Sequence, residues 1–185
     1  ETAFRNQALK PDSILQDTAA ESRRLNGVQN FDRAFQGPMT AARGLLLSRN
    51  VVAERVGQTA GMNNVIDFAH SLGISSDLAD NVSTAIGSSA VRMLDHAGAY
   101  ASFANGGQRV QPFGVLKITD DRGNTYVDNT NQGPVGTVMT PGEAGSITNI
   151  LKWHAPHWGL KFNVPMAGKS GNTDQYVDVW YITYT

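Results

Sequence analysis

The sequence predicts an α+β fold in which helices pack around an antiparallel sheet, with both ends of the fold incomplete. Apolar residues recur at helical spacing between residues 38 and 104, which indicates a run of amphipathic helices. The spacing changes to two in a hairpin expected at 115–127 and again at 176–184, and the segment around Lys169 also resembles a strand. We expect these last two segments to be neighbouring antiparallel strands.

Length and composition are those of one globular domain. At 185 residues, 41% of them hydrophobic, the chain can form a core, and we expect one partial domain with a hairpin and loop excursion at 108–140. The net charge of −1, with Lys and Arg scattered, argues against nucleic acid as a partner. The absence of cysteine excludes disulfides and thiolate metal sites. No apolar run approaches the ~20 residues of a membrane span.

The first part of the chain is predicted to be less regular than the rest. Residues 1–9 indicate the end of a helix, which Pro11 stops. Residues 11–38 are polar and contain turn signals, so we expect irregular structure there. Helical spacing begins at Pro38 and ends near Ser48.

Three further helices are predicted in the next segment. One begins at about Asn50, and another lies between Gly61 and Gly73. A loop rich in Ser and Asp follows at 74–90, and a third helix covers about 92–104.

The 115–127 hairpin turns at 120–123, where the acidic residues have the wrong spacing for a calcium loop and are typical of turn chemistry. Residues 128–140 are expected to form a loop. A helix then begins at Pro141, a residue that favours the first helical position, and continues to about residue 153.

The segment with the clearest chemical signal is Lys169-Ser170-Gly171. An ammonium, a small hydroxyl and a bare glycine on one strand edge can hold a carboxylate and let a peptide backbone lie alongside. This combination is typical of the substrate-holding strand of serine acyl-transfer enzymes that bind penicillin. The alternative interpretation is a surface strand with an exposed lysine beside a turn.

The matching nucleophile pattern, Ser-x-x-Lys, is absent from the 185 residues. None of the five lysines has a serine three positions before it. The residues at those positions are Gln7, Gly114, Asn149, Trp158 and Met166.

A second pattern of the same enzyme class, Ser-x-Asn, occurs as Ser48-Arg49-Asn50, between two predicted helices. In isolation this pattern is weak, because Ser and Asn also favour helix ends and N-caps. His154 and His157 suggest a metal site, but Pro156 lies between them and no third ligand is near in sequence. We therefore expect a partly exposed aromatic loop there, with no metal and no cofactor.

Taken together, these segments resemble the transpeptidase domain of class A penicillin-binding proteins, the bifunctional peptidoglycan synthases. The most specific are Phe103-Ala104-Asn105-Gly106-Gly107 and the Lys169 strand, and the order and spacing of all segments matter most. The matching segments are 35–40, 47–51, 64–74, 85–89, 99–107, 167–173 and 178–185. Residues 11–17 look like the segment that follows the serine-bearing helix. We therefore expect a fragment that begins after the nucleophile and ends before the family's last strand and closing helix.

The resemblance implies a serine-type D,D-transpeptidase in the longer parent protein. Its serine attacks the carbonyl between the two terminal D-alanines of a peptidoglycan stem, and an amine of a neighbouring stem takes the acyl group. Lys169 would supply positive charge, Ser170 would bind the substrate carboxylate and Gly171 would leave room for the substrate backbone. The backbone N–H of Asn172 would form half of an oxyanion hole, and Thr173 would complete the substrate-binding strand.

Ser48 would relay a proton to the leaving amine, and Asn50 would hydrogen-bond the substrate amide. Asn172 replaces the usual Thr, which leaves the affinity for the D-Ala carboxylate and for penicillins open. The implied partners are peptidoglycan stem peptides and β-lactams. The implied location is the extracytoplasmic face of the bacterial membrane, with the parent anchored through a segment outside these residues. The alternatives are a non-catalytic binding or scaffolding module of the same fold, and a penicillin-binding sensor. The fragment alone is expected to be inactive.

Overall fold

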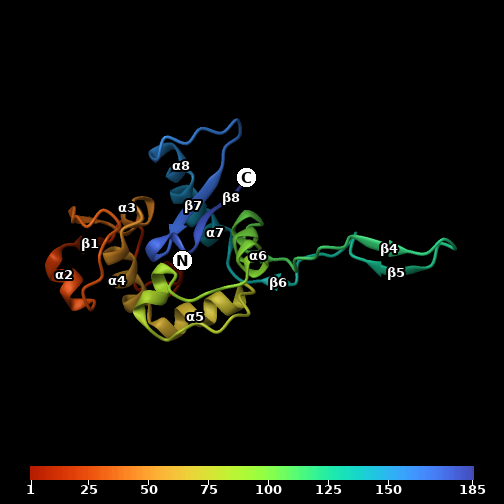
Figure 1. The fold of residues 1–185 in the computed structure, drawn as a ribbon, viewed down its shortest axis with the longest axis horizontal. Coiled ribbons are helices and arrows are strands. Elements are labelled where there is room, and N and C mark those ends of the chain that lie inside the picture. Colours follow the sequence, from red (N-terminus) through yellow and green to blue (C-terminus); the bar gives the residue numbers. More distant parts are fainter.

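An antiparallel pair of strands, β7 (Ala167–Asn172) and β8 (Val179–Tyr184), runs through the body of the molecule. The computed structural model describes residues 1–185, apart from the side chain of Asp174. Helices α6 (Met93–Ala104) and α7 (Pro141–Leu151) contact this pair, which confirms the expected arrangement of helices around an antiparallel sheet (Figure 1). In the described part of the chain, no helix has the length and apolar character needed to cross a membrane.

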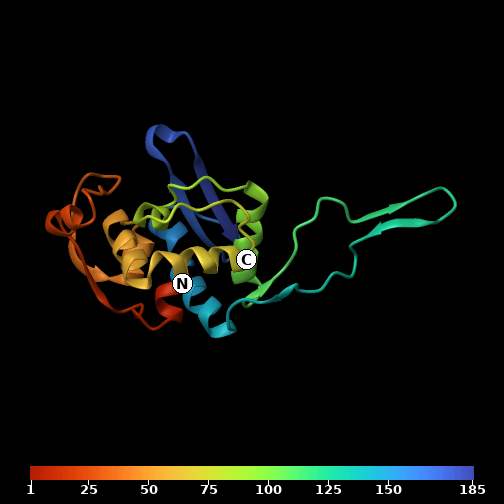
Figure 2. The same cartoon turned by 90° about the horizontal axis from the view of Figure 1, so that it is seen from below.

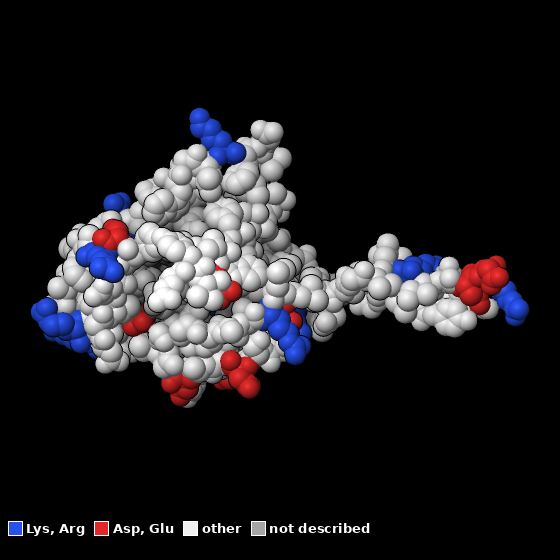
Figure 3. Space-filling model, viewed as in Figure 1, with Lys and Arg blue, Asp and Glu red and all other residues white. Residues whose placement is uncertain are grey.

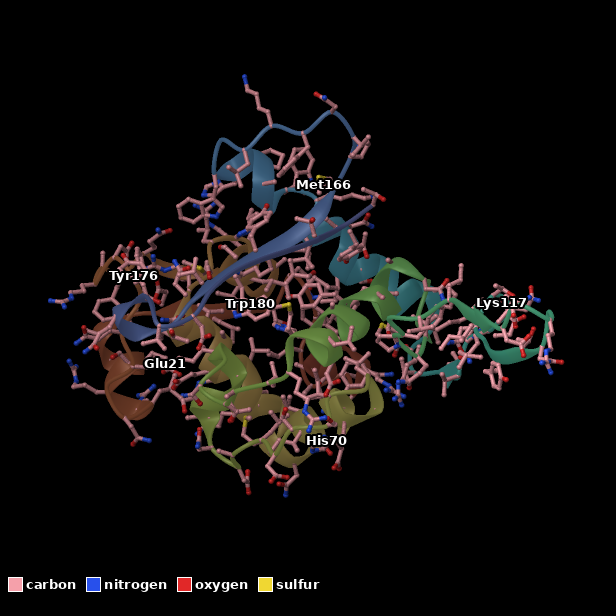
Figure 4. The ribbon with its side chains drawn as sticks, turned by 45° about the vertical axis from the view of Figure 1, so that its right-hand side comes forward. Glu21, His70, Lys117, Met166, Tyr176 and Trp180 are labelled. Carbon is pink, nitrogen blue, oxygen red and sulfur yellow. The ribbon has the colours of Figure 1, made fainter. Side chains whose placement is uncertain are left out.

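Aromatic side chains hold the helices against the strand pair. Side chains alternate along a strand, so Trp180 and Tyr184 lie on the same face of it. The Trp180 ring lies 5.6 Å from the His96 ring, and the Tyr184 ring lies 6.4 Å from the Tyr100 ring, both on α6. The Tyr184 hydroxyl is 2.9 Å from Thr148 Oγ1 on α7. Figure 4 shows the strand pair and the helices around it, with Trp180 between them.

The remaining elements are short and are connected by well-defined turns. The helices are α1 (Thr2–Arg5), α2 (Ala19–Arg24), α3 (Ala41–Leu46), α4 (Asn50–Ala60), α5 (Met62–Ser71) and α8 (His154–His157), with 3-10 turns η1 (Val82–Ile86) and η2 (Asp174–Tyr176). The strands are β1 (Ile14–Asp17), β2 (Gly37–Thr40), β3 (Gln108–Arg109), β4 (Lys117–Thr119), β5 (Thr125–Asp128) and β6 (Gly136–Thr137).

Helices α4, α5, α6 and α7 confirm the sequence prediction, and their ends have clear causes. Gly61, between α4 and α5, has φ +83°, and Gly73, after α5, has φ +105°, a conformation that favours glycine. At the start of α7, the Thr140 hydroxyl accepts the backbone N–H of Glu143, and the Glu143 carboxylate accepts the backbone N–H of Thr140. This reciprocal capping box satisfies two backbone donors that a helix start leaves unpaired.

The larger core cluster lies where α5, α6 and the start of α7 meet. Figure 2 shows α5 spanning the distance between α4 and α6. The buried members of the cluster are Phe68, Leu72, Ile74, Ala99, Met139 and Ala144. Gly107 follows α6 with φ +90°, and a Cβ at this position would lie 2.0 Å from the carbonyl oxygen of Met139. Only glycine therefore allows the chain to leave α6 so close to this cluster.

The prediction that residues 11–38 are irregular is wrong, because they contain β1, α2 and β2. Strand β1 has no apolar alternation to recognise, since its buried side chain is the charged Asp17. Helix α2 begins after Thr18, whose hydroxyl accepts the backbone N–H of Glu21 at 3.2 Å. Local capping and pairing with β2, rather than an apolar stripe, produce these elements.

The predicted helix start at Pro38 is also wrong. Pro38 lies in β2, where it pairs with Gln16 of β1. Helix α3 begins at Ala41, because the Thr40 hydroxyl accepts the backbone N–H of Arg43 at 3.1 Å and makes Thr40 the N-cap.

An arm formed by residues 110–135 extends away from the body (Figures 1 and 2). The expected hairpin forms its outer part, where β4 pairs with β5 and the Asp120 carboxylate accepts the backbone N–H of Asn124 at 2.7 Å. The expected loop at 128–140 contains the two-residue strand β6, which pairs with β3. On the face seen in Figure 3, positive and negative side chains are interspersed, on the arm as on the body.

A buried ion pair joins β1 to the turn between α3 and α4. Arg49 Nε lies 2.9 Å from Asp17 Oδ2, and the two side chains are 5% and 0% exposed. Asp17 also accepts the Asn30 side-chain amide at 2.7 Å and the Gln36 backbone N–H at 3.0 Å. Arg49 makes a further pair, at 2.8 Å, with the half-exposed Asp32. A buried charge with this many partners holds the turn in one place, because a shift of the turn would leave a buried charged group without its partners.

We expect Asp17→Ala to lower the free energy of unfolding by about 3–5 kcal/mol, because it leaves the buried Arg49 guanidinium without its buried partner. Urea unfolding at neutral pH measures this. The control is Asp32→Ala, which removes the exposed partner and should cost about 1 kcal/mol or less. Equal losses in the two variants would contradict the central role of Asp17.

Candidate active site

The side chains of Lys169 and Ser48 meet, although they are 121 positions apart in the sequence. Lys169 Nζ donates to Ser48 Oγ at 2.7 Å and to the carbonyl oxygen of Ser170 at 2.6 Å. Lys169 is on β7, and Ser48 is in the turn between α3 and α4. The structure therefore brings together the two segments in which the sequence predicts catalytic residues.

Ser48 has an unusual backbone conformation, with φ +56°. It follows the last turn of α3, where its own N–H donates to Leu45 O at 3.2 Å and the N–H of Arg49 donates to Gly44 O at 2.9 Å. This is the Schellman arrangement that ends many helices, and its left-handed position is usually occupied by glycine. A serine there costs about 1 kcal/mol of backbone strain, and the ion pair of the neighbouring Arg49 offsets that cost.

Burial of the Lys169 side chain lowers its pKa from 10.5 to about 8. The ammonium is therefore charged at neutral pH but gives up its proton more readily than an exposed lysine. Because Lys169 donates to Ser48 Oγ, the hydroxyl hydrogen of Ser48 is free to point toward a third group. A lysine and a serine in this relation can hold an anion and pass on a proton.

The edge of β7 that faces away from β8 carries the backbone groups of two other predicted residues, Ser170 and Asn172. The backbone N–H of Ser170 points to this edge, where it donates to His154 Nε2 at 3.2 Å. Because the backbone groups of alternate residues point to the same edge, those of Asn172 also point there. Between them, Gly171 has no heavy atom within 4 Å of the position that a Cβ would occupy. The face of β7 is thus open at Gly171, whereas His154 occupies the strand edge at Ser170.

His154 is a site residue that the sequence pattern did not reveal. The prediction of a partly exposed loop is wrong for this position, because His154 is 0% exposed and begins the short helix α8. Pro156 falls within the first turn of α8, where the missing N–H of proline costs nothing. His157, in the same helix, is exposed. In the described part of the chain, no group of three His, Asp or Glu residues is placed to hold a metal ion.

Two other predicted residues do not join this cluster. Asn50 lies in the first turn of α4, and its side-chain amide donates to Gln29 O at 2.9 Å. The Thr173 hydroxyl accepts the backbone N–H of Asp178 at 2.8 Å, which closes the turn between β7 and β8. Both side chains thus have structural contacts of their own in this structure.

The family model described as the penicillin binding protein transpeptidase domain matches residues 2–184. The chain belongs to this family.

Two curated relatives within this family show how much of a longer protein the chain represents. Penicillin-binding protein 1A of Rickettsia bellii is 25% identical over 207 residues, which cover 96% of this chain and 26% of the relative. Penicillin-binding protein 1A/1B of Bacillus subtilis is 31% identical over 182 residues, which cover 85% of this chain and 20% of the relative. The chain therefore spans about a quarter or less of the length of these two relatives.

Solved structures show the same fold. PonA1 of Mycobacterium tuberculosis matches with a TM-score of 0.85 at 21% identity, over 100% of this chain and 55% of that one. A second PonA1 structure, in complex with penicillin V, matches with a TM-score of 0.83 at 21% identity, over 100% and 54%. The D,D-transpeptidase domain of a peptidoglycan glycosyltransferase from Eggerthella lenta gives 0.79 at 17% identity, over 98% and 54%. The β-lactamase/transpeptidase-like fold is thus confirmed.

The lowered pKa of Lys169 makes folding stability depend on pH. The unfolded chain keeps the lysine proton up to about pH 10.5, whereas the folded chain releases it at about 8. The unfolded state binds more protons between these values, so the Lys169 contribution to stability should rise from pH 8 to 10.5 and be constant below 8. Urea unfolding of wild type and Lys169→Met across this range isolates that rise as a difference, and identical pH slopes would contradict it.

We expect Ser48→Gly to be more stable than Ser48→Ala by about 1 kcal/mol, because glycine adopts φ +56° without strain. Both variants lose the hydroxyl that accepts the Lys169 hydrogen bond, so the comparison measures the backbone alone. Chemical unfolding of both variants decides the matter. Equal stabilities would show that Ser48 is not strained.

Proposed function

We propose that residues 1–185 are the substrate-holding part of a peptidoglycan D,D-transpeptidase that works by serine acyl transfer and binds β-lactams. The single observation that carries this proposal is the hydrogen bond from Lys169 to Ser48, at 2.7 Å. It joins the Lys-Ser-Gly strand to the Ser-x-Asn turn in a chain that belongs to the transpeptidase family. The complex of the structurally similar PonA1 with penicillin V supports the choice of ligand.

The part of β7 around Gly171 and Asn172 would hold the acyl donor. The D-Ala carboxylate would lie near the Lys169 ammonium and the Ser170 hydroxyl, where a charge-assisted hydrogen bond contributes about 1.5–3 kcal/mol. The substrate backbone would run beside Gly171, where the structure leaves space. The backbone N–H of Asn172, on the same edge, would donate to the oxyanion as half of the oxyanion hole.

Ser48 would pass the proton to the leaving amine. Its hydroxyl accepts from Lys169 and so has its own hydrogen available for the leaving nitrogen. When Ser48 donates that proton, the Lys169 ammonium can replace it, since the pKa of this lysine is lowered to about 8. Asn50, in the adjacent turn of α4, would bind the substrate amide after exchanging its present partner, Gln29 O.

The nucleophile of this reaction would lie outside the 185 residues, which contain no Ser-x-x-Lys. The acceptor of the acyl group would be an amine of a neighbouring stem peptide. This chemistry would take place on the extracytoplasmic face of the bacterial membrane, to which the parent protein would be anchored through another segment. Asn172 and Thr173 would complete the binding strand, with the amide of Asn172 replacing a hydroxyl.

A fluorescent penicillin tests the proposal. The 185-residue chain should form no covalent adduct, whereas a longer polypeptide of the same protein that contains Ser-x-x-Lys should form one. Lys169→Met in that longer polypeptide should slow acylation by about 10–100-fold, because it removes the positive charge and the donor to Ser48. Gel fluorescence over time measures the rate.

The matched control is Lys117→Met, which changes an exposed lysine on the arm and should leave the acylation rate unchanged. An adduct on the 185-residue chain alone would contradict the predicted place of the nucleophile. A longer polypeptide with no adduct would favour the non-catalytic binding module.

A further inference from the structure

One buried side chain connects the end of α3 to β7, the two elements that carry the candidate site. His154 Nδ1 lies 3.0 Å from the carbonyl oxygen of Leu46, in the last turn of α3 and two residues before Ser48. His154 Nε2 lies 3.0 Å from Ser170 Oγ and accepts the Ser170 backbone N–H at 3.2 Å. The ring stacks on Tyr181, with 6.1 Å between centroids and 25° between planes.

These partners determine the protonation state of the imidazole. The carbonyl of Leu46 can only accept, so Nδ1 must carry a hydrogen. The backbone N–H of Ser170 can only donate, so Nε2 must present its lone pair. His154 is therefore a neutral imidazole in the Nδ1–H form. A second proton, on Nε2, would face the N–H of Ser170 and break that contact.

The neutral imidazole in turn orients the Ser170 hydroxyl. With Nε2 acting as acceptor, the hydroxyl donates its hydrogen to His154 and keeps its lone pairs for other donors. A carboxylate bound at the β7 edge would compete with His154 for that hydrogen. Ser170 Oγ is thus held in a defined position before any ligand arrives.

We propose that His154 is a positioning residue that, in its neutral Nδ1–H form, clamps the end of α3 to β7. The clamp fixes the spacing between the Ser48 hydroxyl and Ser170, and it holds Ser170 Oγ in place, with its hydrogen on Nε2 until a carboxylate competes for it. Its consequence for acylation rests on the proposed function, whereas the clamp itself is a property of the 185-residue chain.

The surroundings of His154 keep the clamp closed at neutral pH. Burial lowers the pKa of His154, and the nearby Lys169 on β7 and His157 on α8 lower it further, whereas the hydrogen bond with Leu46 O raises it. Tyr181 on β8 stacks on the ring. Since the folded pKa is below that of a free imidazole, about 6.5, the stability that the clamp contributes is complete above pH 6.5 and is lost as the pH falls.

Nuclear magnetic resonance of the imidazole nitrogens in the 185-residue chain tests the clamp without any penicillin. The spectrum should show the Nδ1–H tautomer of His154 and a titration midpoint below about 6.5. Lys169→Gln should raise that midpoint, because it removes a nearby positive charge. Ser170→Ala should shift the Nε2 resonance. An Nε2–H tautomer, or a midpoint at or above about 6.5, would overturn the proposal.

Acylation of the longer polypeptide by a fluorescent penicillin tests the consequence. His154→Phe keeps a ring on Tyr181 but removes both hydrogen bonds, so acylation should slow by about tenfold. In the wild type, protonation of His154 should also lower the acylation rate as the pH falls, and this dependence should be absent from His154→Phe. His154→Gln, whose amide oxygen can accept the Ser170 N–H, should restore part of the rate. Lys117→Met, on the exposed arm, is the control and should leave the rate unchanged.

A folded His154→Phe variant with the wild-type rate and pH profile would overturn the positioning role. If His154→Phe does not fold, the rate and pH profile of His154→Gln decide in the same way. If the unmodified longer polypeptide forms no adduct, the proposed function fails, and the resonance experiment still decides whether the clamp exists.

Discussion

The site depends on keeping an ammonium group partly buried between two elements that are distant in the sequence. Lys169 loses hydration when β7 docks on the α3–α4 turn, and its hydrogen bonds to Ser48 and to Ser170 O offset part of that loss. The pKa of Lys169, lowered to about 8, reflects the part of the lost hydration that these hydrogen bonds do not replace. A bound carboxylate would place a negative charge beside this ammonium. The uncompensated burial of Lys169, which lowers the stability of the free chain, would therefore favour an anionic ligand.

A partly buried ammonium group needs both elements around it, the α3–α4 turn and β7, to be held in fixed positions. Asp17 and Arg49 fix the turn that carries Ser48, which is why a serine can persist there with φ +56°. On the other side, the pairing of β7 with β8 and the packing of Tyr184 against α6 and α7 fix the strand. The positions of Ser48 and Lys169 thus depend on contacts made by residues outside the candidate site.

Apolar periodicity predicted α4, α5, α6 and β8, whereas the helix-start signal at Pro141 predicted α7. The turn residues at 120–123 between two alternating segments predicted the β4–β5 hairpin, and the Lys-Ser-Gly motif predicted β7 beside β8. The motifs identified Lys169 and Ser48 as candidate site residues, but not the direct hydrogen bond between them. Asp17 and His154 could not be found this way, since a lone buried charge or imidazole has no local pattern and its partners come from distant segments. Elements stabilised by caps and strand pairing, such as α2 and β2, were not predicted for the same reason.

The separation of 121 residues between Lys169 and Ser48 has a consequence for synthesis of the protein. A chain that leaves the ribosome from its N-terminus can form the α3–α4 turn early, but no binding edge exists until β7 has emerged and β8 has paired with it. Such long-range contacts close late and slowly. The contact between Lys169 and Ser48 can therefore form only after residues 167–184 have been synthesised and the two strands have paired.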